Sequence, residues 1–509
     1  MLLFATLAAA FVLAPAPTQG GYRTEKLRQY GLEFPVPRRY EAIPTQPTEK
    51  LVVRKWFGEP AKKTKYRFDK RPEALLVILP VAEEEVEAQR TSADGGEGTP
   101  SSIQDFFLQR YSAKKASWRL GARDALDSKG TYVRFEYPLE PKGLYSGRSG
   151  RAFTWKGPDR TVCLIASCVA EDFNKQLKIW RRMAGKMELS APGVAGTSTS
   201  ERYYAKHKNF KDPKFRIELR DTLPRGWKAD DTENFIFLYS TKDEKLLRIL
   251  KRELEAIRKA YLERFPALEE IRAVSAVRVC RDKAEYRDYG GIPGSAGYWN
   301  YVAKELVFYD QGKGDGRADS RIVLYHEAFH QYIYYCAGEV SPHSWFNEGH
   351  GDYFSGARFS RTGAISKIGT NPWRLPYVKR LIDSGQHRTF DDILYLDKPR
   401  FYADGARCYA QAWSIVYFLR EAKKVRAHKR WRTILPTYFE TLRSTFQAEL
   451  DALEERARDD PEVAGPDDPE ALAEVKQKAR EAAIERALAG VDLFELEQAW
   501  LDFMNDLKP

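Results

Sequence analysis

The hydrophobic pattern of the first third of the chain predicts a mixture of strands and helices. Three stretches show the apolar runs or the alternation typical of buried and half-buried strands, namely Ala74–Val81, Tyr132–Tyr137 and Thr161–Ala170. Two stretches carry apolar residues at helical spacing, namely Ser101–Lys115 and Asp172–Met187. We therefore expect residues 21–190 to form one mixed α/β domain.

A second folded region is expected after a linker. Residues 191–230 are assigned to that linker because they open with the small and polar run Ala191–Ser200. Phe235–Tyr239 is then a predicted strand, and Thr241 with Glu244 three residues later has the form of a capping box at the start of a helix. The buried side of this helix is predicted to consist of Leu246, Leu250, Leu254, Ile257 and Tyr261. Further strands are expected at Ala273–Cys280 and Glu305–Tyr309.

The next predicted helix begins near Ser320, a suitable N-cap, and ends near Gly338. Its buried side is expected to consist of Ile322, Val323, Phe329 and Ile333. Beyond about residue 370 the pattern is mostly helical, with an interruption at the Asp/Pro-rich Asp459–Asp468 and a closing helix at Leu493–Leu507. The predicted fold class is α+β, with residues 231–365 as one subdomain and residues 366–509 as a helical carboxy-terminal subdomain.

Composition narrows the range of partners and compartments. The 83 Lys and Arg against 72 Asp and Glu give a net charge of +11, but no nucleic-acid motif accompanies it, so we expect a solvated basic face and no nucleic-acid partner. The five cysteines form no disulfide framework, since Cys163 and Cys168 share one predicted strand and would lie about 16 Å apart.

The amino terminus has the pattern of a signal peptide. Leu2–Ala14 is an apolar stretch too short to span a bilayer, and small residues follow it, so residues 1–20 are expected to be removed on export. No later stretch approaches 18 uninterrupted apolar residues. We expect a periplasmic or extracellular protein without stable membrane insertion, and the sequence leaves its oligomeric state open.

The segment with the clearest chemical content is His326-Glu327-Ala328-Phe329-His330. Residues four apart on a helix project from one face, so the imidazoles of His326 and His330 can reach one metal ion. Glu327 lies beside them, where its carboxylate can act on a metal-activated water. A pair of core histidines is the structural alternative, although composition alone should produce this motif in under about one such chain in a hundred.

A catalytic zinc ion takes three protein ligands, so a third ligand is expected downstream. A third histidine six residues after His330 is absent, because Cys336 stands there. The segment Ser344–Phe354 offers Glu348 instead, with Asp352 four residues later. Gly349 and Gly351 each cost this helix about 1 kcal/mol relative to Ala, but they allow it to lie close to the first helix.

This pattern resembles the gluzincins, the zinc metallopeptidases typified by thermolysin and by the zinc aminopeptidases. The resemblance implies one Zn²⁺ per chain, with His326, His330 and Glu348 as ligands and Glu327 as general base. It also implies that Asp352 orients the first histidine, and it places Asn347 beside the third ligand. The implied substrate is a protein or peptide, and the implied domain is a small sheet with the metal-binding helices.

A further gluzincin feature is a helix that opens with a tyrosine, and Tyr409–Leu419 resembles it. In the aminopeptidase branch that tyrosine donates a hydrogen bond to the oxyanion, which makes Tyr409 the candidate, with Tyr402 as second choice. Most of the 28 tyrosines in such a chain are packing residues, so that alternative stays open. His350 is two residues from Glu348 and should point elsewhere.

The strand before the motif implies how a substrate binds. Gluzincins pair extended substrates with an exposed edge strand, and Glu305, Leu306, Val307, Phe308 and Tyr309 are expected to form that edge. The aminopeptidase branch has a glutamate near here that holds the substrate's amino terminus, but Gly294–Asn300 contains no acid. Cleavage within chains is therefore favoured over removal of terminal residues.

Residues 21–190 faintly resemble the PsbP-like sandwich, through the opening Gly31–Pro37 and the strand-then-helix ending. That region carries no catalytic motif and is expected to be an accessory domain. Three hypotheses follow for the whole chain: an exported zinc endopeptidase, a zinc hydrolase of a non-peptide amide or ester, and a non-catalytic binding protein with a structural zinc site. A structural site usually has four protein ligands, and it gives Glu327 no required role.

Overall fold

The computed structural model describes residues 21–46, 49, 51–59, 71–80, 106, 110, 124–125, 132–139, 148–156, 160–169, 172–190, 198–207, 209–267, 270–313, 315–460 and 464–508. The chain divides into two units, the first made of most residues before 197 and the second containing all residues from Thr197 onward. Sheets in the amino-terminal unit and helices toward the carboxy terminus give an α+β fold. The predicted signal peptide and nearly all of the predicted helix Ser101–Lys115 lie outside the described residues.

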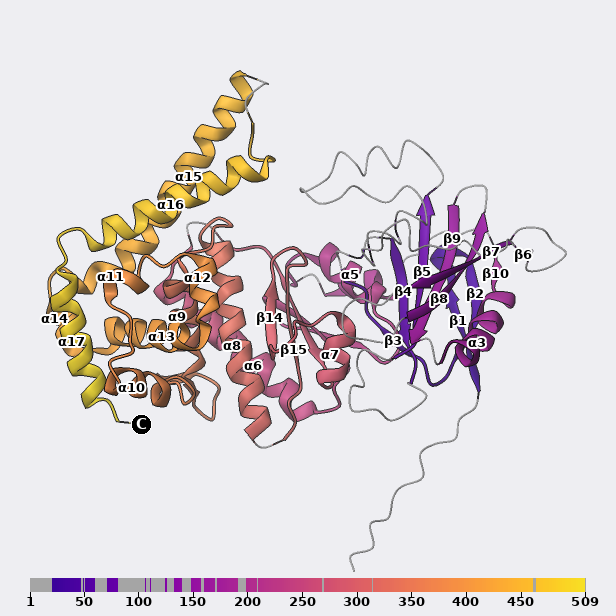
Figure 1. Cartoon of the computed structure of the whole chain (residues 1–509), viewed down its shortest axis with the longest axis horizontal. Helices are drawn as coiled ribbons and strands as arrows, with labels where there is room; N and C mark the ends of the chain where they lie inside the picture. The colour runs from indigo at the N-terminus through magenta and orange to yellow at the C-terminus, as the bar shows by residue number, and fades with distance from the viewer. Residues whose placement is uncertain are drawn as a thin grey trace, which may run out of the picture. The chain divides into compact units, whose positions relative to one another are not determined.

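The described part of the amino-terminal unit includes two sheets and an α-helix that packs on them (Figure 1). The smaller sheet has the order β1 (Tyr22–Leu27), β2 (Leu32–Pro37) and β10 (Glu188–Leu189). The larger sheet has the order β3 (Glu41–Ile43), β4 (Val52–Phe57), β5 (Glu73–Pro80), β9 (Arg160–Val169), β8 (Arg148–Lys156), β7 (Tyr132–Leu139) and β6 (Asp124–Ala125). The helix is α3 (Phe173–Gly185), and it packs on β2, β8 and β9.

The core of this unit explains why the apolar runs form strands. β5 and β9 pair in antiparallel register from Glu73 with Ser167 to Pro80 with Arg160. Their inward side chains meet three fully buried tryptophans, Trp56, Trp155 and Trp180. The predicted strands and the predicted helix Asp172–Met187 are confirmed here to within two residues at each end.

The second unit is built on a mixed five-stranded sheet. Its order is β11 (Lys228–Asp231), β12 (Phe235–Tyr239), β13 (Ser275–Cys280), β15 (Glu305–Tyr309) and β14 (Gly297–Asn300). The three central strands are parallel, and the two outer strands are antiparallel to their neighbours. One face packs on α6 (Glu244–Arg264) and α8 (Asp315–Cys336), and the other packs on α5 (Pro213–Thr222). The short α7 (Lys283–Tyr289) contacts β13 and β15.

The edge of this sheet differs from the prediction. Glu305–Tyr309 was expected to be the exposed edge, but β15 lies between β13 and β14, and its residues Glu305 to Phe308 are buried. The edge is β14, which pairs antiparallel with β15 from Gly297 with Phe308 to Asn300 with Glu305. The expectation was wrong because β14 is only four residues long and lies in a turn-rich stretch, where its pairing does not show as a hydrophobic run.

The expected linker is also wrong over residues 198–230. This stretch forms α4 (Thr199–Lys206), α5 and most of β11, while residues 191–197 lie outside the described part. The fully buried Arg216 of α5 binds Asp231 of β11 at 2.6 Å and donates to the carbonyl oxygen of Phe235 at 3.0 Å. These polar contacts attach a segment whose composition resembles a loop.

Two helix starts fall at other residues than predicted. The N-cap of α6 is Asp243, whose carboxylate accepts from the Leu246 backbone N–H at 2.9 Å, while Thr241 donates to Asp310 at 2.7 Å. Ser320 lies inside α8, where its hydroxyl donates to the carbonyl oxygen of Gly316 at 3.0 Å. Each hydroxyl was expected to cap a helix and instead donates its hydrogen bond to another residue. The predicted buried face of α6 and the stop near Gly338 are confirmed.

Helices form almost all of the rest, as predicted beyond residue 370. They are α9 (Ser344–Ser355), α10 (Leu375–Asp383), α11 (Phe390–Ile393), α12 (Lys398–Ala403), α13 (Gly405–Glu421), α14 (Lys423–Ala427), α15 (Ile434–Asp459), α16 (Pro469–Leu488) and α17 (Leu493–Asp506). A hairpin of β16 (Ala357–Phe359) and β17 (Ile365–Ile368) follows α9. The long helices α15 and α16 run side by side on either side of the predicted interruption (Figure 1). Within the described residues, no helix combines the length and the apolar character that a membrane crossing requires.

Replacing Arg216 tests whether the segment before β12 belongs to the folded unit. Arg216→Ala should lower the free energy of unfolding by about 3 kcal/mol, because it leaves the buried Asp231 carboxylate without one of its partners. The exposed Arg225 of the same segment offers a matched control, and Arg225→Ala should change stability by less than about 0.5 kcal/mol. Urea unfolding followed by circular dichroism measures both. Equal stabilities of the two variants would mean that this segment contributes nothing.

Candidate metal centre

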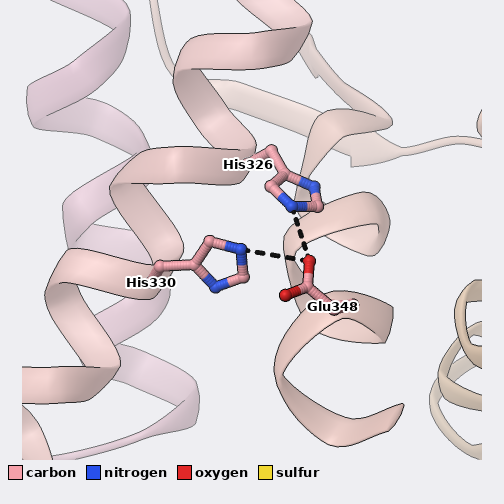
Figure 2. Close-up of side chains that lie close together, drawn as sticks. All are labelled: His326, His330 and Glu348. Atoms are coloured by element: carbon pink, nitrogen blue, oxygen red, sulfur yellow. Dashed lines mark hydrogen bonds and ion pairs between the residues drawn. The ribbon is translucent and has the colours of Figure 1, made fainter. Parts of the chain in front are cut away.

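The two motif histidines and Glu348 converge at one point between two helices. His326 and His330 project from one face of α8, and Glu348 projects toward them from α9 (Figure 2). Oε2 of Glu348 lies 3.0 Å from Nε2 of His326 and 3.3 Å from Nε2 of His330. One ligand atom from each residue lies within 4.8 Å of the others. The structure therefore brings together the three residues that the sequence singled out.

Asp352 holds His326 from the side opposite Glu348. One turn after Glu348, its Oδ1 lies 3.1 Å from Nδ1 of His326. Oδ2 of Asp352 accepts a hydrogen bond from Nε of Arg374 at 2.6 Å, and its backbone carbonyl accepts one from the buried Asn371 at 3.2 Å. An imidazole whose Nδ1–H donates to a carboxylate can present its Nε2 atom to a metal ion. Asp352 therefore lies where the resemblance placed it.

Two tyrosines approach the cluster from the segment after α10. The Tyr402 hydroxyl donates to Oε1 of Glu348 at 2.5 Å. The Tyr409 ring stacks on the His326 ring, with the centroids 6.1 Å apart and the planes at 23°. The guanidinium of Arg374 lies over the same Tyr409 ring, 4.9 Å from its centroid. Tyr402, the second candidate for the oxyanion donor in the sequence analysis, is therefore the tyrosine with a direct hydrogen bond to a candidate ligand.

Glu327 faces the edge strand. Its Oε2 accepts a hydrogen bond from the backbone N–H of Trp299 in β14 at 2.9 Å. Trp299 belongs to the outermost strand on this side of the sheet, so this hydrogen bond joins Glu327 to the sheet edge. The carboxylate of Glu327 is thus positioned by the sheet edge and lies one residue from the first histidine.

Glycine makes the approach of the helices possible. A Cβ atom on Gly351 would lie 2.8 Å from Nδ1 of His326, and one on Gly349 would lie 2.6 Å from the carbonyl oxygen of Ala412 in α13. Real Cβ contacts essentially never fall below 3.0 Å. The helix α9 therefore fits between α8 and α13 only with glycine at these two positions, as the sequence suggested for the first helix.

The charges of the cluster compensate one another. Burial alone would lower the pKa of His326, but Asp352 and Glu348 hold it well above its ordinary value. Burial would also lower the pKa of His330, but the negative charge of Glu348 raises it above its ordinary value. Burial would raise the pKa of Glu348, yet the two imidazoles keep it well below its ordinary value. A divalent cation on the same atoms would have to displace imidazole protons, so its binding would weaken in acid.

Other polar residues near the motif are placed elsewhere. His350 points away from the cluster, as helix geometry predicts, because Nδ1 donates to the carbonyl oxygen of Phe346 and Nε2 accepts from Arg420, both at 2.8 Å. Oδ1 of Asn347 is buried and has no hydrogen-bond partner among the described residues, and the same holds for Nδ1 of His330. The resemblance placed Asn347 beside the third ligand, and its Oδ1 makes no hydrogen bond to the cluster.

The sequence analysis missed three residues that bond to Glu327 or Asp352 beside the cluster, namely Trp299, Asn371 and Arg374. Each lies on an element other than α8 and α9, and its contact is made by tertiary packing. A sequence signal was present for Asn371, because an Asn-Pro pair such as Asn371-Pro372 favours the start of a turn. In the structure its side chain accepts hydrogen bonds from the Trp373 and Arg374 N–H groups. The sequence contains no comparable signal for Trp299 or Arg374.

Part of the chain matches the model of a protein family. Residues 322–431 match the model of a family described as "Protein of unknown function (DUF1570)". This range contains the histidine motif, Glu348, Asp352 and both tyrosines. No curated protein matches the chain. The gluzincin resemblance therefore rests on the sequence motifs alone.

Several solved structures are weakly similar to this chain. Cyanobacterial PsbP from Synechocystis sp. PCC 6803 is 12% identical, with 35% of this chain and 99% of that chain covered and a TM-score of 0.23. The Saccharomyces cerevisiae Ran-binding protein Mog1p is 10% identical, with 33% and 95% covered and a TM-score of 0.22. LpqN of Mycobacterium tuberculosis is 10% identical, with 31% and 83% covered and a TM-score of 0.21. The amino-terminal region thus has a weak likeness to PsbP-like folds, which carries no statement about function.

His343, just before α9, should make the protein sensitive to acid. Burial and the nearby Arg480 lower the pKa of His343 to about 4, and its Nδ1 lies 2.8 Å from the Tyr438 hydroxyl. A folded-state pKa below the ordinary 6.5 means that the unfolded chain binds the proton more tightly. Above about pH 6.5 His343 is neutral in both states and does not affect stability. As the pH falls from 6.5 to 4, the free energy of unfolding decreases by up to about 1.4 kcal/mol per pH unit.

The variant His343→Gln should therefore lose less stability than the wild type between pH 7 and pH 5. Urea unfolding at both values measures the difference, and His207→Gln at an exposed position is the matched control. The control should lose as much stability as the wild type. An equal loss of stability in all three proteins would contradict the lowered pKa of His343 in the folded protein.

Proposed function

We propose that His326, His330 and Glu348 hold the catalytic zinc ion of an exported metallopeptidase that cleaves within polypeptide chains. The observation that carries this proposal is the convergence of two imidazole Nε2 atoms and one carboxylate oxygen beside Glu327. Among the described residues, the cluster contains no fourth His, Cys, Asp or Glu. Three protein ligands are typical of catalytic zinc, and four are typical of structural zinc.

The donor set fits zinc. Two neutral imidazole nitrogens and one carboxylate oxygen suit this ion, and the Asp352 carboxylate favours the tautomer of His326 that presents Nε2 to it. Bound Zn²⁺ would polarise the scissile carbonyl and lower the pKa of an attacking water toward about 7. The remaining steps are assigned to side chains of this chain.

Glu327 is proposed as the general base and acid. Its carboxylate takes a proton from the attacking water and passes it to the leaving amine. The Trp299 N–H keeps this carboxylate at the sheet edge, where an extended substrate would lie. Tyr409 is proposed to donate a hydrogen bond to the developing oxyanion. Burial, with the charge of Glu348, raises the pKa of Tyr409, so its hydroxyl keeps its proton near neutral pH.

The edge strand β14 supports a polypeptide substrate. Its outer backbone groups can pair with an extended chain, the role first expected of Glu305–Tyr309. The segment Gly294–Asn300, which includes β14, contains no acidic side chain that could hold a free amino terminus. This supports cleavage within chains. Export is proposed from the apolar stretch Leu2–Ala14, which lies outside the described residues.

The variant Glu327→Gln tests the proposal directly. It should bind one zinc ion per chain like the wild type, because Glu327 is not a ligand, and it should hydrolyse an unfolded protein such as casein at least about 100-fold more slowly. Glu263→Gln, at an exposed position of α6, is the matched control and should keep full activity. Metal analysis and a fluorescent casein assay measure both properties.

Three outcomes separate the hypotheses. Zinc binding with activity lost in Glu327→Gln supports the peptidase. Zinc binding with no proteolysis, but with hydrolysis of a simple ester or amide that needs Glu327, would favour a non-peptide substrate. Zinc binding without hydrolysis of any kind would favour a structural zinc site in a binding protein.

Replacing Gly351 should weaken metal binding without removing a ligand. The added methyl group of Gly351→Ala would meet the His326 ring at 2.8 Å and displace it from Asp352 and Glu348. We expect zinc affinity to fall by about 10- to 100-fold, as when a residue that orients a ligand is lost. Gly185→Ala, where nothing lies within 4 Å of the new Cβ, is the control. Competition with a chromophoric chelator measures affinity, and an unchanged affinity in Gly351→Ala would contradict the geometry.

A further inference from the structure

The two carboxylate oxygens of Glu348 have different partners. Oε2 faces Nε2 of His326 at 3.0 Å and Nε2 of His330 at 3.3 Å, so it points to the place where the three ligands converge. Oε1 accepts the hydrogen bond of the Tyr402 hydroxyl at 2.5 Å. The side chain of Glu348 is buried, with 4% of it exposed, so water cannot easily replace either partner.

A carboxylate can bind a metal ion through one oxygen or through both. Binding through both would use a coordination position that a catalytic zinc site keeps open for water or substrate. A hydroxyl that donates to one carboxylate oxygen makes that oxygen a poorer ligand and fixes the rotation of the group. Hydrogen bonds to ionised groups are strong and directional, so one such bond suffices.

We infer that Tyr402 positions Glu348 as a one-oxygen ligand and thereby keeps a coordination position free. Tyr402 is thus a positioning residue that acts through Glu348, and oxyanion donation stays with Tyr409. It comes from α12, fifty-four residues after Glu348, and its ring packs against the Tyr409 ring with centroids 6.1 Å apart. This inference rests on the proposed metal site and adds to it the residue that sets the number of ligand atoms.

Cobalt(II) substitution tests this assignment, because the intensity of its visible bands falls as its coordination number rises. Wild type, Tyr402→Phe and Tyr395→Phe are loaded with Co²⁺, and their absorption spectra are compared. Tyr395 is an exposed tyrosine in the segment before α12, so it controls for loss of a hydroxyl group. Thermal unfolding of the metal-free proteins checks that all three are folded.

The expected result is a weaker visible band in Tyr402→Phe, with zinc affinity about tenfold lower in chelator competition. Tyr395→Phe should match the wild type in both. A Tyr402→Phe spectrum that coincides with that of the wild type would overturn the inference and leave the metal site standing. A wild type that takes up neither Co²⁺ nor Zn²⁺ would refute the metal site itself, and the role of Tyr402 with it.

Discussion

The close approach of α9 to α8 is the constraint on which the rest of the site depends. Glu348 reaches both histidines only because α9 lies against α8 at Gly351 and against α13 at Gly349. Each glycine destabilises the helix by about 1 kcal/mol relative to Ala. The same glycines allow the short distance between the helices. Tertiary packing of the surrounding aromatic residues makes up the difference.

The same packing produces a closed set of contacts around His326. Asp352 binds its Nδ1, Glu348 faces its Nε2 and Tyr409 stacks on its ring. Arg374 joins two of these, because it donates to Asp352 and lies over Tyr409. A ring held at both nitrogens and on its face has little freedom to rotate. A metal ion bound there would meet ligands that are already oriented, which reduces the entropy lost on binding.

The sequence predicted those parts of the site that depend on local spacing. His326 and His330 share a helix face by periodicity alone, and Asp352 stands one turn from Glu348 for the same reason. Contacts between distant segments were not accessible. Trp299 meets Glu327 only because β14 pairs with β15, and Arg374 meets Asp352 only because the turn before α10 folds back on α9. The prediction of β15 as the edge strand was wrong for the same reason, because strand order depends on pairing between distant segments and not on the apolar run of β15.

The most direct test of the metal centre is an anomalous-difference map collected at the zinc absorption edge from crystals of the purified protein. We predict a single peak bonded to Nε2 of His326, Nε2 of His330 and one oxygen of Glu348 at about 2.0–2.2 Å, with a non-protein fourth ligand. A zinc ion with four protein ligands, a peak elsewhere, or no peak from zinc-saturated crystals would contradict it.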